Sequence, residues 1–201
     1  MEKAKEVFNY CYLDRFDIED LEERKIYINQ EIDSDVIDGA VYHILRYNKL
    51  DKGIPKEERK PIFLYINSPG GSVVDGYGLI DAILSSETPV YTINQALCAS
   101  MGFLIFIAGH KRFSMQHSEF LMHDGSTFGW DSTAKMKDRM DFETKELEQM
   151  TKRYIISHTN IDEKLYDEKY RVEWYFLPAL AKEIGVVDYI VGQDCSINEI
   201  C

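Results

Sequence analysis

The sequence from Asn94 to Gly109 reads NQALCASMGFLIFIAG, and from Met101 to Ala108 it contains no charged or strongly polar side chain. This apolar run is too short to span a bilayer, which requires ~20 residues. It therefore predicts a buried core helix with Ser100 at its N-terminus, where free backbone N–H groups can stabilise a developing oxyanion. The alternative is that Ser100 serves only as the N-cap, because serine is favoured at that position.

The composition predicts one globular domain with a sizeable core. The chain has 201 residues, of which 45% are apolar and 29% are charged, an ordinary balance for a globular protein. The 23 Lys and Arg residues against 35 Asp and Glu residues give a formal charge of −12. We therefore expect no nucleic-acid partner, because nucleic-acid-binding proteins usually present a basic face.

The cysteines and the N-terminus predict the compartment. The four cysteines, at positions 11, 98, 195 and 201, show no metal-binding spacing and indicate no disulfide framework, which favours a reducing environment. The first residues contain acids and lead into no apolar stretch of signal-peptide length. We therefore expect a cytoplasmic protein without a membrane span, a metal or a cofactor.

The order of the predicted elements is typical of an α/β protein. Apolar runs predict strands over residues 25–29, 62–66, 90–93, 111–115, 119–122 and 186–191. Helical spacing predicts helices from Asp33 or Ser34 onward and over residues 73–84, 101–108, 132–158 and 177–184, with a polar loop before the last one. Such alternation indicates a largely parallel sheet with right-handed crossovers. We divide the chain into an N-terminal arm (1–24), one domain (25–193) and a mobile C-terminal tail (194–201).

Three features follow predicted strands and could share one edge of the sheet. The glycine pair at positions 70 and 71 follows one strand, Ser100 follows the next, and His123 follows another. The ends of parallel strands gather at one edge, where sites form. If these residues meet, Ser100 is a nucleophile, His123 is its general base, and the N–H groups of Gly71 and Met101 form an oxyanion hole. Taken singly, the glycines could be an ordinary turn and the histidine structural.

The third member of such a triad, a carboxylate that orients the histidine, is not chosen by spacing. Four carboxylates stay open at this point: Asp124, Asp162, Asp167 and Glu173.

Taken in order, the motifs of this chain resemble those of the ClpP family of self-compartmentalised serine peptidases. The matching motifs are YINSPGGSV at 65–73, ASMG at 99–102, KRF at 111–113, MH at 122–123, HT at 158–159 and EIGVVD at 183–188. The likeness covers roughly residues 24–191. Carried over by position, it implies that Ser100 is the nucleophile and His123 the base, with the N–H groups of Gly71 and Met101 holding the oxyanion.

Several departures mark the chain as a divergent member of that family. The family's acid is an aspartate, placed twelve residues before the glycine that matches Gly185; that position holds Glu173 here, with Asp124 as a local alternative. Ala96 stands where the family has a glycine, and Asp124-Gly125 replaces a Gln-Pro pair. Residues 126–131 replace a glycine-rich stretch, and residues 1–23 do not match the family's axial loop.

The resemblance implies a crotonase-like (ClpP-type) spiral of βαβ units with a protruding handle helix. It also implies homo-oligomeric rings of seven subunits, two of which can pair, and an AAA+ unfoldase as partner. The implied activity is that of a serine endopeptidase that cleaves unfolded proteins or peptides through an acyl-enzyme. Apolar residues of the long helix would then contribute both to a subunit interface and to the core, namely Met136, Met140, Met150 and Tyr154.

Two other functions remain open at the level of sequence. The chain could be a catalytically weak or inactive ring subunit that pairs with an active homologue, a reading that the Glu173 and Asp124-Gly125 departures motivate. It could also be a coenzyme A enzyme of the wider crotonase superfamily. That reading lacks support, because those enzymes place a carboxylate rather than a Ser/His pair at the site.

Overall fold

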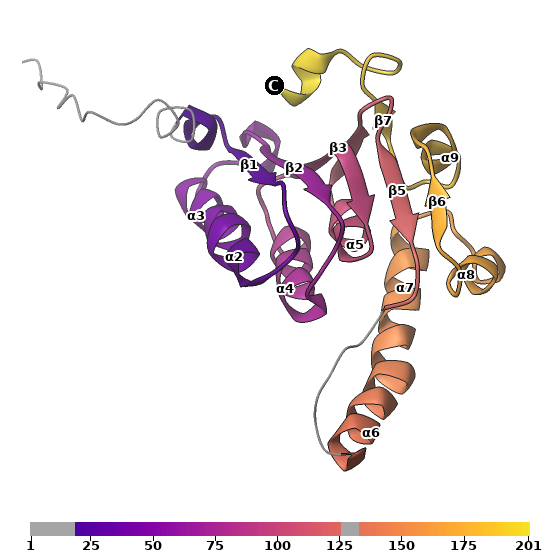
Figure 1. The fold of residues 1–201 in the computed structure, drawn as a ribbon. Helices are drawn as coiled ribbons and strands as arrows, with labels where there is room; N and C mark the ends of the chain where they lie inside the picture. Colours follow the sequence, from indigo (N-terminus) through magenta and orange to yellow (C-terminus); the bar gives the residue numbers. More distant parts are fainter. Residues whose placement is uncertain (1–18, 126–132) are drawn as a thin grey trace, which may run out of the picture.

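The computed structural model describes residues 19–125 and 133–201, and it contains a seven-stranded, mostly parallel sheet (Figure 1). The strands β1 (Lys25–Ile28), β2 (Ile62–Ser68), β3 (Val90–Ala99), β4 (Lys111–Ser114) and β7 (Tyr189–Ile190) lie side by side in that order. Strand β5 (Glu119–Met122) branches from β3, and β6 (Trp174–Phe176) pairs antiparallel with β5. The predicted α/β fold with a largely parallel sheet is confirmed.

Strand β3 forks between two neighbours and is longer than the predicted strand over 90–93. Its first half pairs with β4, and its end pairs with β5, where Ala99 lies opposite Leu121. At the fork, the buried side-chain amide of Asn94 donates a hydrogen bond to the Glu119 carbonyl at 2.9 Å. The polar Asn94 and Gln95 interrupt the apolar run, so the sequence pattern concealed the second half of this strand. The fork brings β5 against the end of β3 that leads to Ser100.

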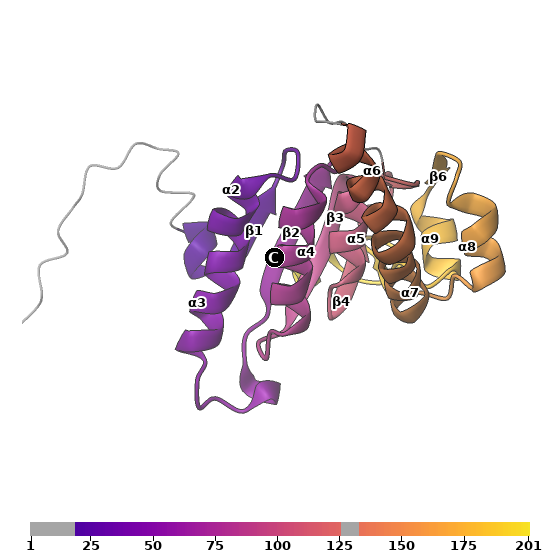
Figure 2. The ribbon, with the colours of Figure 1, turned by 90° about the horizontal axis from the view of Figure 1, so that it is seen from below.

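Helices cover one face of the sheet (Figure 2). They include α2 (Ser34–Val36), α3 (Tyr42–Leu50), α4 (Val73–Leu84), α5 (Met101–Ile107) and α7 (Glu148–His158), with a π-helical turn (Ile37–Val41) between α2 and α3. The predicted start at Asp33 is confirmed, because its side chain accepts a hydrogen bond from the Asp35 N–H at 3.0 Å. Every residue of α5 is buried, as its uniformly apolar sequence predicts.

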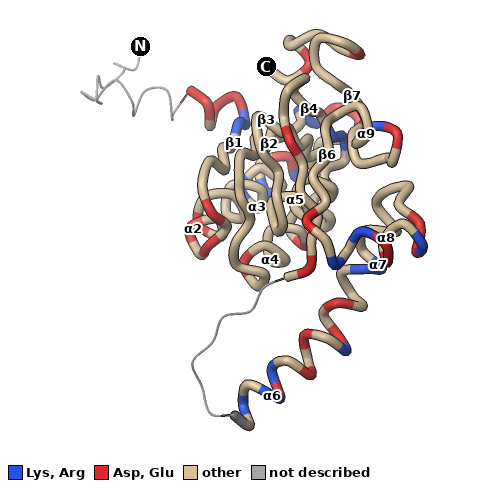
Figure 3. Tube along the Cα trace, turned by 45° about the vertical axis from the view of Figure 1, so that its right-hand side comes forward, with Lys and Arg blue, Asp and Glu red and all other residues tan. Residues whose placement is uncertain are grey.

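The handle helix extends away from the sheet (Figure 1). It consists of α6 (Thr133–Phe142), a π-helical turn (Glu143–Leu147) and α7. The expectation that its apolar residues also serve the core is wrong for Met136, Met140 and Met150, which are exposed, and confirmed for Tyr154, which packs against the core. Basic and acidic residues are interspersed along α6 (Figure 3), which fits a helix standing away from the body of the domain. Only the last turns reach the core, through Ile155 and Tyr154.

Residues 159–176 contain structure where the sequence predicted a polar loop. Helix α8 (Glu163–Lys169) begins after Asp162, whose side chain accepts a hydrogen bond from the Leu165 N–H at 2.7 Å. Strand β6 follows it, and α9 (Pro178–Glu183) ends with Ile184 as its C-cap, so Gly185, which the sequence predicted as the cap, has φ 69° and lies one residue beyond it. The strand predicted over 186–191 is shorter in the structure and consists only of β7. The N–H groups of Val186 and Val187 donate to the Ala181 carbonyl and are not part of the sheet.

The opposite face of the sheet carries a second, aromatic cluster. Phe63, Tyr65, Tyr91 and Phe113 lie on this face with Val191, and the 3-10 helix at Ile197–Ile200 buries Ile200 against them. The Tyr65 hydroxyl donates to the Ile200 carbonyl. The expectation of a mobile tail over 194–201 is therefore wrong. Gly192, with φ 84°, turns the chain back so that the C-terminal segment (residues 192–201) covers the cluster.

Three of the motifs that carry the resemblance meet at one ion pair. The Arg112 guanidinium contacts the Asp188 carboxylate at 2.8 Å and donates to the His158 carbonyl at 2.7 Å. The cation satisfies a carbonyl at the end of α7, where the partial charge of a helix is negative. These motifs therefore tie β4, α7 and β7 together.

The predicted N-terminal arm and the departure at 126–131 fall largely outside the described residues; residues 19–22 are helical. In the part of the chain that the structure describes, no helix is long and apolar enough to cross a bilayer.

Candidate active site

Ser100 forms the turn between β3 and α5 in an unusual backbone conformation. Its φ is 53° and its ψ is −121°, and its hydroxyl makes no capping hydrogen bond with α5. Positive φ is unfavourable for a residue with a Cβ and persists only where the surroundings enforce it. A strained strand-to-helix turn of this kind presents the nucleophilic serine of α/β-hydrolases. The hydroxyl is therefore not used as an N-cap and stays available for chemistry.

Gly70 and Gly71 bring the end of β2 against the Ser100 turn. Their φ values are 103° and 143°, a region that L side chains rarely adopt. A Cβ built on Gly70 would lie 2.6 Å from the Ser100 Cβ and 3.1 Å from the Met101 nitrogen. A Cβ built on Gly71 would lie 2.3 Å from the Ile32 carbonyl oxygen. Both positions thus require glycine, for their backbone angles and for these close approaches.

The N–H groups expected to form an oxyanion hole lie on these two segments. Gly71 sits beside Ile32 in a parallel bridge whose hydrogen bonds use the neighbouring Gly70 carbonyl and Ser72 N–H. Among the hydrogen bonds between described residues, none uses the N–H of Gly71 or of Met101 as donor. Two donors are thus available on segments in contact next to Ser100.

Strand register places the end of β5, which leads to His123, alongside the Ser100 turn, and places His123 opposite Glu173. The Ser100 N–H donates to the Leu121 carbonyl at 3.0 Å, so β5 ends alongside the turn. On the other side of β5, Met122 pairs with Trp174, and one residue further His123 faces Glu173. The His123 Nδ1 lies 3.4 Å from the Glu173 Oε1. This separation is longer than an ordinary N–H···O hydrogen bond, and the Glu173 side chain is 62% exposed.

Of the other three carboxylates left open by the sequence, two are engaged elsewhere and the third is exposed. Asp162 caps α8, and Asp167 pairs with Lys152 at 2.7 Å. Asp124 is exposed and makes no ion pair with any described residue. Its charge acts on Tyr170, whose pKa is raised chiefly by burial and further by nearby carboxylates that include Asp124. Of the four, Glu173 is the carboxylate that the fold brings to His123.

Sequence reasoning missed Tyr175, which is the second partner of Glu173. Its hydroxyl donates to the Glu173 Oε2 at 3.1 Å, and this hydrogen bond is the main cause that raises the pKa of Tyr175. The signal was the alternating stretch Val172-Glu173-Trp174-Tyr175-Phe176, which is typical of a strand and places residues 173 and 175 on one face.

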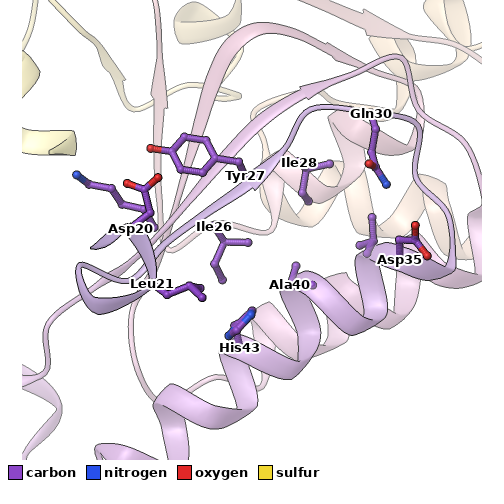
Figure 4. Close-up of a pocket in the computed structure, with 12 residues that line it drawn as sticks. Asp20, Leu21, Ile26, Tyr27, Ile28, Gln30, Asp35, Ala40 and His43 are labelled. Atoms are coloured by element: carbon purple, nitrogen blue, oxygen red, sulfur yellow. The ribbon is translucent and has the colours of Figure 1, made fainter. Parts of the chain in front are cut away.

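A separate cavity of about 320 Å³ lies at the far edge of the sheet, between β1 and the α2–α3 helices (Figure 4). Ile26, Ile28, Ala40 and His43 line it, and burial lowers the pKa of His43. Strand β2 separates β1 from β3, so this cavity is not part of the Ser100 site. Among residues 19–125 and 133–201, no three His, Cys, Asp or Glu side chains gather in a way that could hold a metal ion.

Comparison with known proteins gives consistent matches over most of the chain. The Clp protease family model matches residues 15–194. The chain is 31% identical over 182 residues to the ATP-dependent Clp protease proteolytic subunit 2 of Prochlorococcus marinus (strain MIT 9312), which covers 88% of this chain and 85% of the relative. It is 32% identical over 176 residues to proteolytic subunit 3 of Parasynechococcus marenigrum (strain WH8102), covering 85% and 84%. A match to proteolytic subunit 2 of Treponema pallidum (strain Nichols) is 39% identical over 105 residues and spans 51% of this chain and 50% of that relative.

Proposed function

Because this chain belongs to the Clp protease family, we propose that it is a serine endopeptidase that cleaves unfolded proteins or peptides through an acyl-enzyme. The observation that carries the proposal is the contact of the His123 Nδ1 with the Glu173 Oε1 beside the strained Ser100 turn. A nucleophile, a base and an orienting acid on neighbouring strand ends are the parts that acyl transfer requires.

The proposed reaction assigns one role to each group. Because the His123 Nδ1 faces Glu173, its Nε2 is the nitrogen that takes the proton from the Ser100 hydroxyl. The Ser100 oxygen then bonds to the carbonyl carbon of the peptide, and the N–H groups of Gly71 and Met101 stabilise the negative oxygen. The C–N bond breaks as His123 gives the proton to the leaving amine, and water hydrolyses the ester by the same steps.

We also propose that the chain works as part of a ring. The relatives are named proteolytic subunits of an ATP-dependent protease, which fits a chambered homo-oligomer of seven-subunit rings, fed by an AAA+ unfoldase that supplies the ATP hydrolysis. Exposed apolar side chains on the handle, namely those of Met136, Met140, Phe142 and Met150, offer an interface. The free thiols of Cys98, Cys195 and Cys201 fit the reducing cytoplasm.

One observation favours a second candidate function, an inactive ring subunit that pairs with an active homologue. The Glu173 side chain is 62% exposed and its contact with His123 is 3.4 Å, so the acid is held less tightly than in a buried triad. In that case the chain would help to build the ring but would not hydrolyse peptides itself.

Labelling with a fluorophosphonate, followed by intact mass and peptide mapping, tests the proposed function. We expect a single adduct on Ser100, and we expect Ser100→Ala to abolish both the adduct and the hydrolysis of a fluorogenic peptide. Ser157→Ala is the matched control, because Ser157 is an exposed serine on α7 that bonds the Tyr154 carbonyl. An assembled particle without an adduct would favour the inactive subunit, and undiminished turnover in Ser100→Ala would end the nucleophile assignment.

A further inference from the structure

The carboxylate of Glu173 has a different partner on each oxygen. Its Oε1 faces the His123 Nδ1 at 3.4 Å, and its Oε2 accepts a hydrogen bond from the Tyr175 hydroxyl at 3.1 Å. Tyr175 therefore binds Oε2, the carboxylate oxygen of Glu173 that does not contact His123. Its contact is also the shorter of the two.

The strand geometry explains why these three side chains meet. Glu173 directly precedes β6 and lies on the same outer side as Tyr175, two residues further on. Trp174 and Phe176 turn inward, with ring centroids 4.8 Å apart, and Phe176 stacks on Phe120. Tyr175 pairs with Leu121 on β5, and His123 lies two residues further on, directly after the last residue of that strand. Alternation therefore puts His123, Glu173 and Tyr175 on one face of the β5–β6 ribbon.

An exposed glutamate needs such an anchor if it is to orient a histidine. Three side-chain torsions separate its carboxylate from the backbone, and water competes for both oxygens. With the Glu173 side chain 62% exposed, the contact with His123 alone leaves many rotamers accessible. The Tyr175 hydroxyl, two residues further along the chain on the same side, disfavours most of these rotamers because it holds the carboxylate by a hydrogen bond.

Building on the proposed function, we infer that Tyr175 is a positioning residue that holds the Glu173 carboxylate toward the Nδ1 of His123. Tyr175 does not touch the substrate bond, and it keeps its proton throughout the reaction. Tyr175 affects the step in which the His123 imidazole becomes positively charged, because an oriented carboxylate stabilises that charge. A tyrosine hydroxyl is protonated at neutral pH and can donate this hydrogen bond, which also raises the pKa of Tyr175.

Peptide hydrolysis by the assembled protein tests this role. We expect Tyr175→Phe to lower kcat by about threefold to tenfold, the effect of one hydrogen bond to a solvent-exposed charged group. KM should stay within about twofold, because the hydroxyl acts on a catalytic group and not on substrate binding. In the Glu173→Ala background, Tyr175→Phe should cause no further loss, since its partner is gone. Tyr189→Phe is the matched control, as Tyr189 is an exposed strand tyrosine stacked on Phe113 away from the site.

The outcomes separate the two proposals. Equal losses from Tyr175→Phe in both backgrounds, or a rise in KM alone, would overturn the positioning role while leaving the triad intact. An unchanged kcat in Tyr175→Phe, with Glu173→Ala clearly impaired, would do the same. If Ser100→Ala were as active as the wild type, the proposed function itself would fall, and the role of Tyr175 with it. The particle mass of each variant shows whether a lower kcat results from disassembly of the particle and not from the loss of a positioning hydrogen bond.

Discussion

At the scale of the residue, two carboxylates near His123 lie at very different distances from it along the chain. Asp124 follows His123 directly, yet adjacent residues of an extended chain point to opposite sides. Glu173 lies about fifty positions away and faces the imidazole because antiparallel pairing of β5 and β6 places it there. The longer side chain of a glutamate suits this arrangement, since it reaches from β6 across to β5 and still leaves an oxygen for Tyr175.

We expect Glu173→Gln to lower kcat on the order of 100-fold, because an amide cannot stabilise the charged imidazole and can hold the wrong tautomer. Asp124→Asn, the matched removal of a neighbouring charge, should leave kcat within about twofold. Steady-state hydrolysis of a short fluorogenic peptide by both variants checks this. The reverse ranking would transfer the role of the acid to Asp124.

At the scale of the element, the C-terminal segment acts as a cover for the aromatic face of the sheet. Ile200 is only 3% exposed within the cluster, whereas Ile197 on the same 3-10 turn is 53% exposed. A hydrogen bond from the Tyr65 hydroxyl to the Ile200 carbonyl ties the turn to β2. The Asp194 carboxylate also accepts from the Ile190 N–H at 2.7 Å and pairs with Lys182, so the segment is fixed at both ends.

We therefore predict that Ile200→Ala lowers the free energy of unfolding by about 2 kcal/mol, through lost apolar burial and the space left behind. Ile197→Ala, on the solvent side of the same turn, should change it by less than about 0.5 kcal/mol. Urea unfolding at one protein concentration makes the comparison, because assembly also contributes to stability. Equal effects of the two substitutions would mean that the segment does not stay on the cluster in solution.

At the scale of the whole molecule, the exposed apolar surface points to assembly. Large apolar side chains are exposed on the handle, on the outer side of α3 and α4, and around β6 and α9; they include Met140, Leu45, Val74, Leu177 and Leu180. Monomeric proteins rarely expose several such areas together. The proposed rings would bury them and would also enclose a site whose acid is otherwise open to solvent.

Light scattering should accordingly give a particle mass many times the 23.4 kDa of one chain. Met140→Glu should reduce the fraction assembled at micromolar protein, because it would bury an unpaired charge in the handle interface. Lys137→Glu, a charge change at a solvated position of the same helix, is the control and should leave assembly unchanged. A monomeric wild type would contradict the chambered arrangement.

Local patterns in the sequence determined the parts of this protein that depend on neighbours along the chain. The apolar run after Ser100 predicted a buried helix, the runs before Asn67 and Asn94 predicted covered strands, and the glycine pair at 70 and 71 marked a turn whose backbone angles suit glycine. The tertiary structure decided what depends on distant pairing: the fork of β3, the strand β6 within an apparent loop, and the folded C-terminal segment. It also brought Glu173, the position that the resemblance indicated, within 3.4 Å of His123, and it added Tyr175 as a second partner. Pairing of β5 with β6 makes these contacts, and local patterns along a chain do not encode the register of two strands about fifty residues apart.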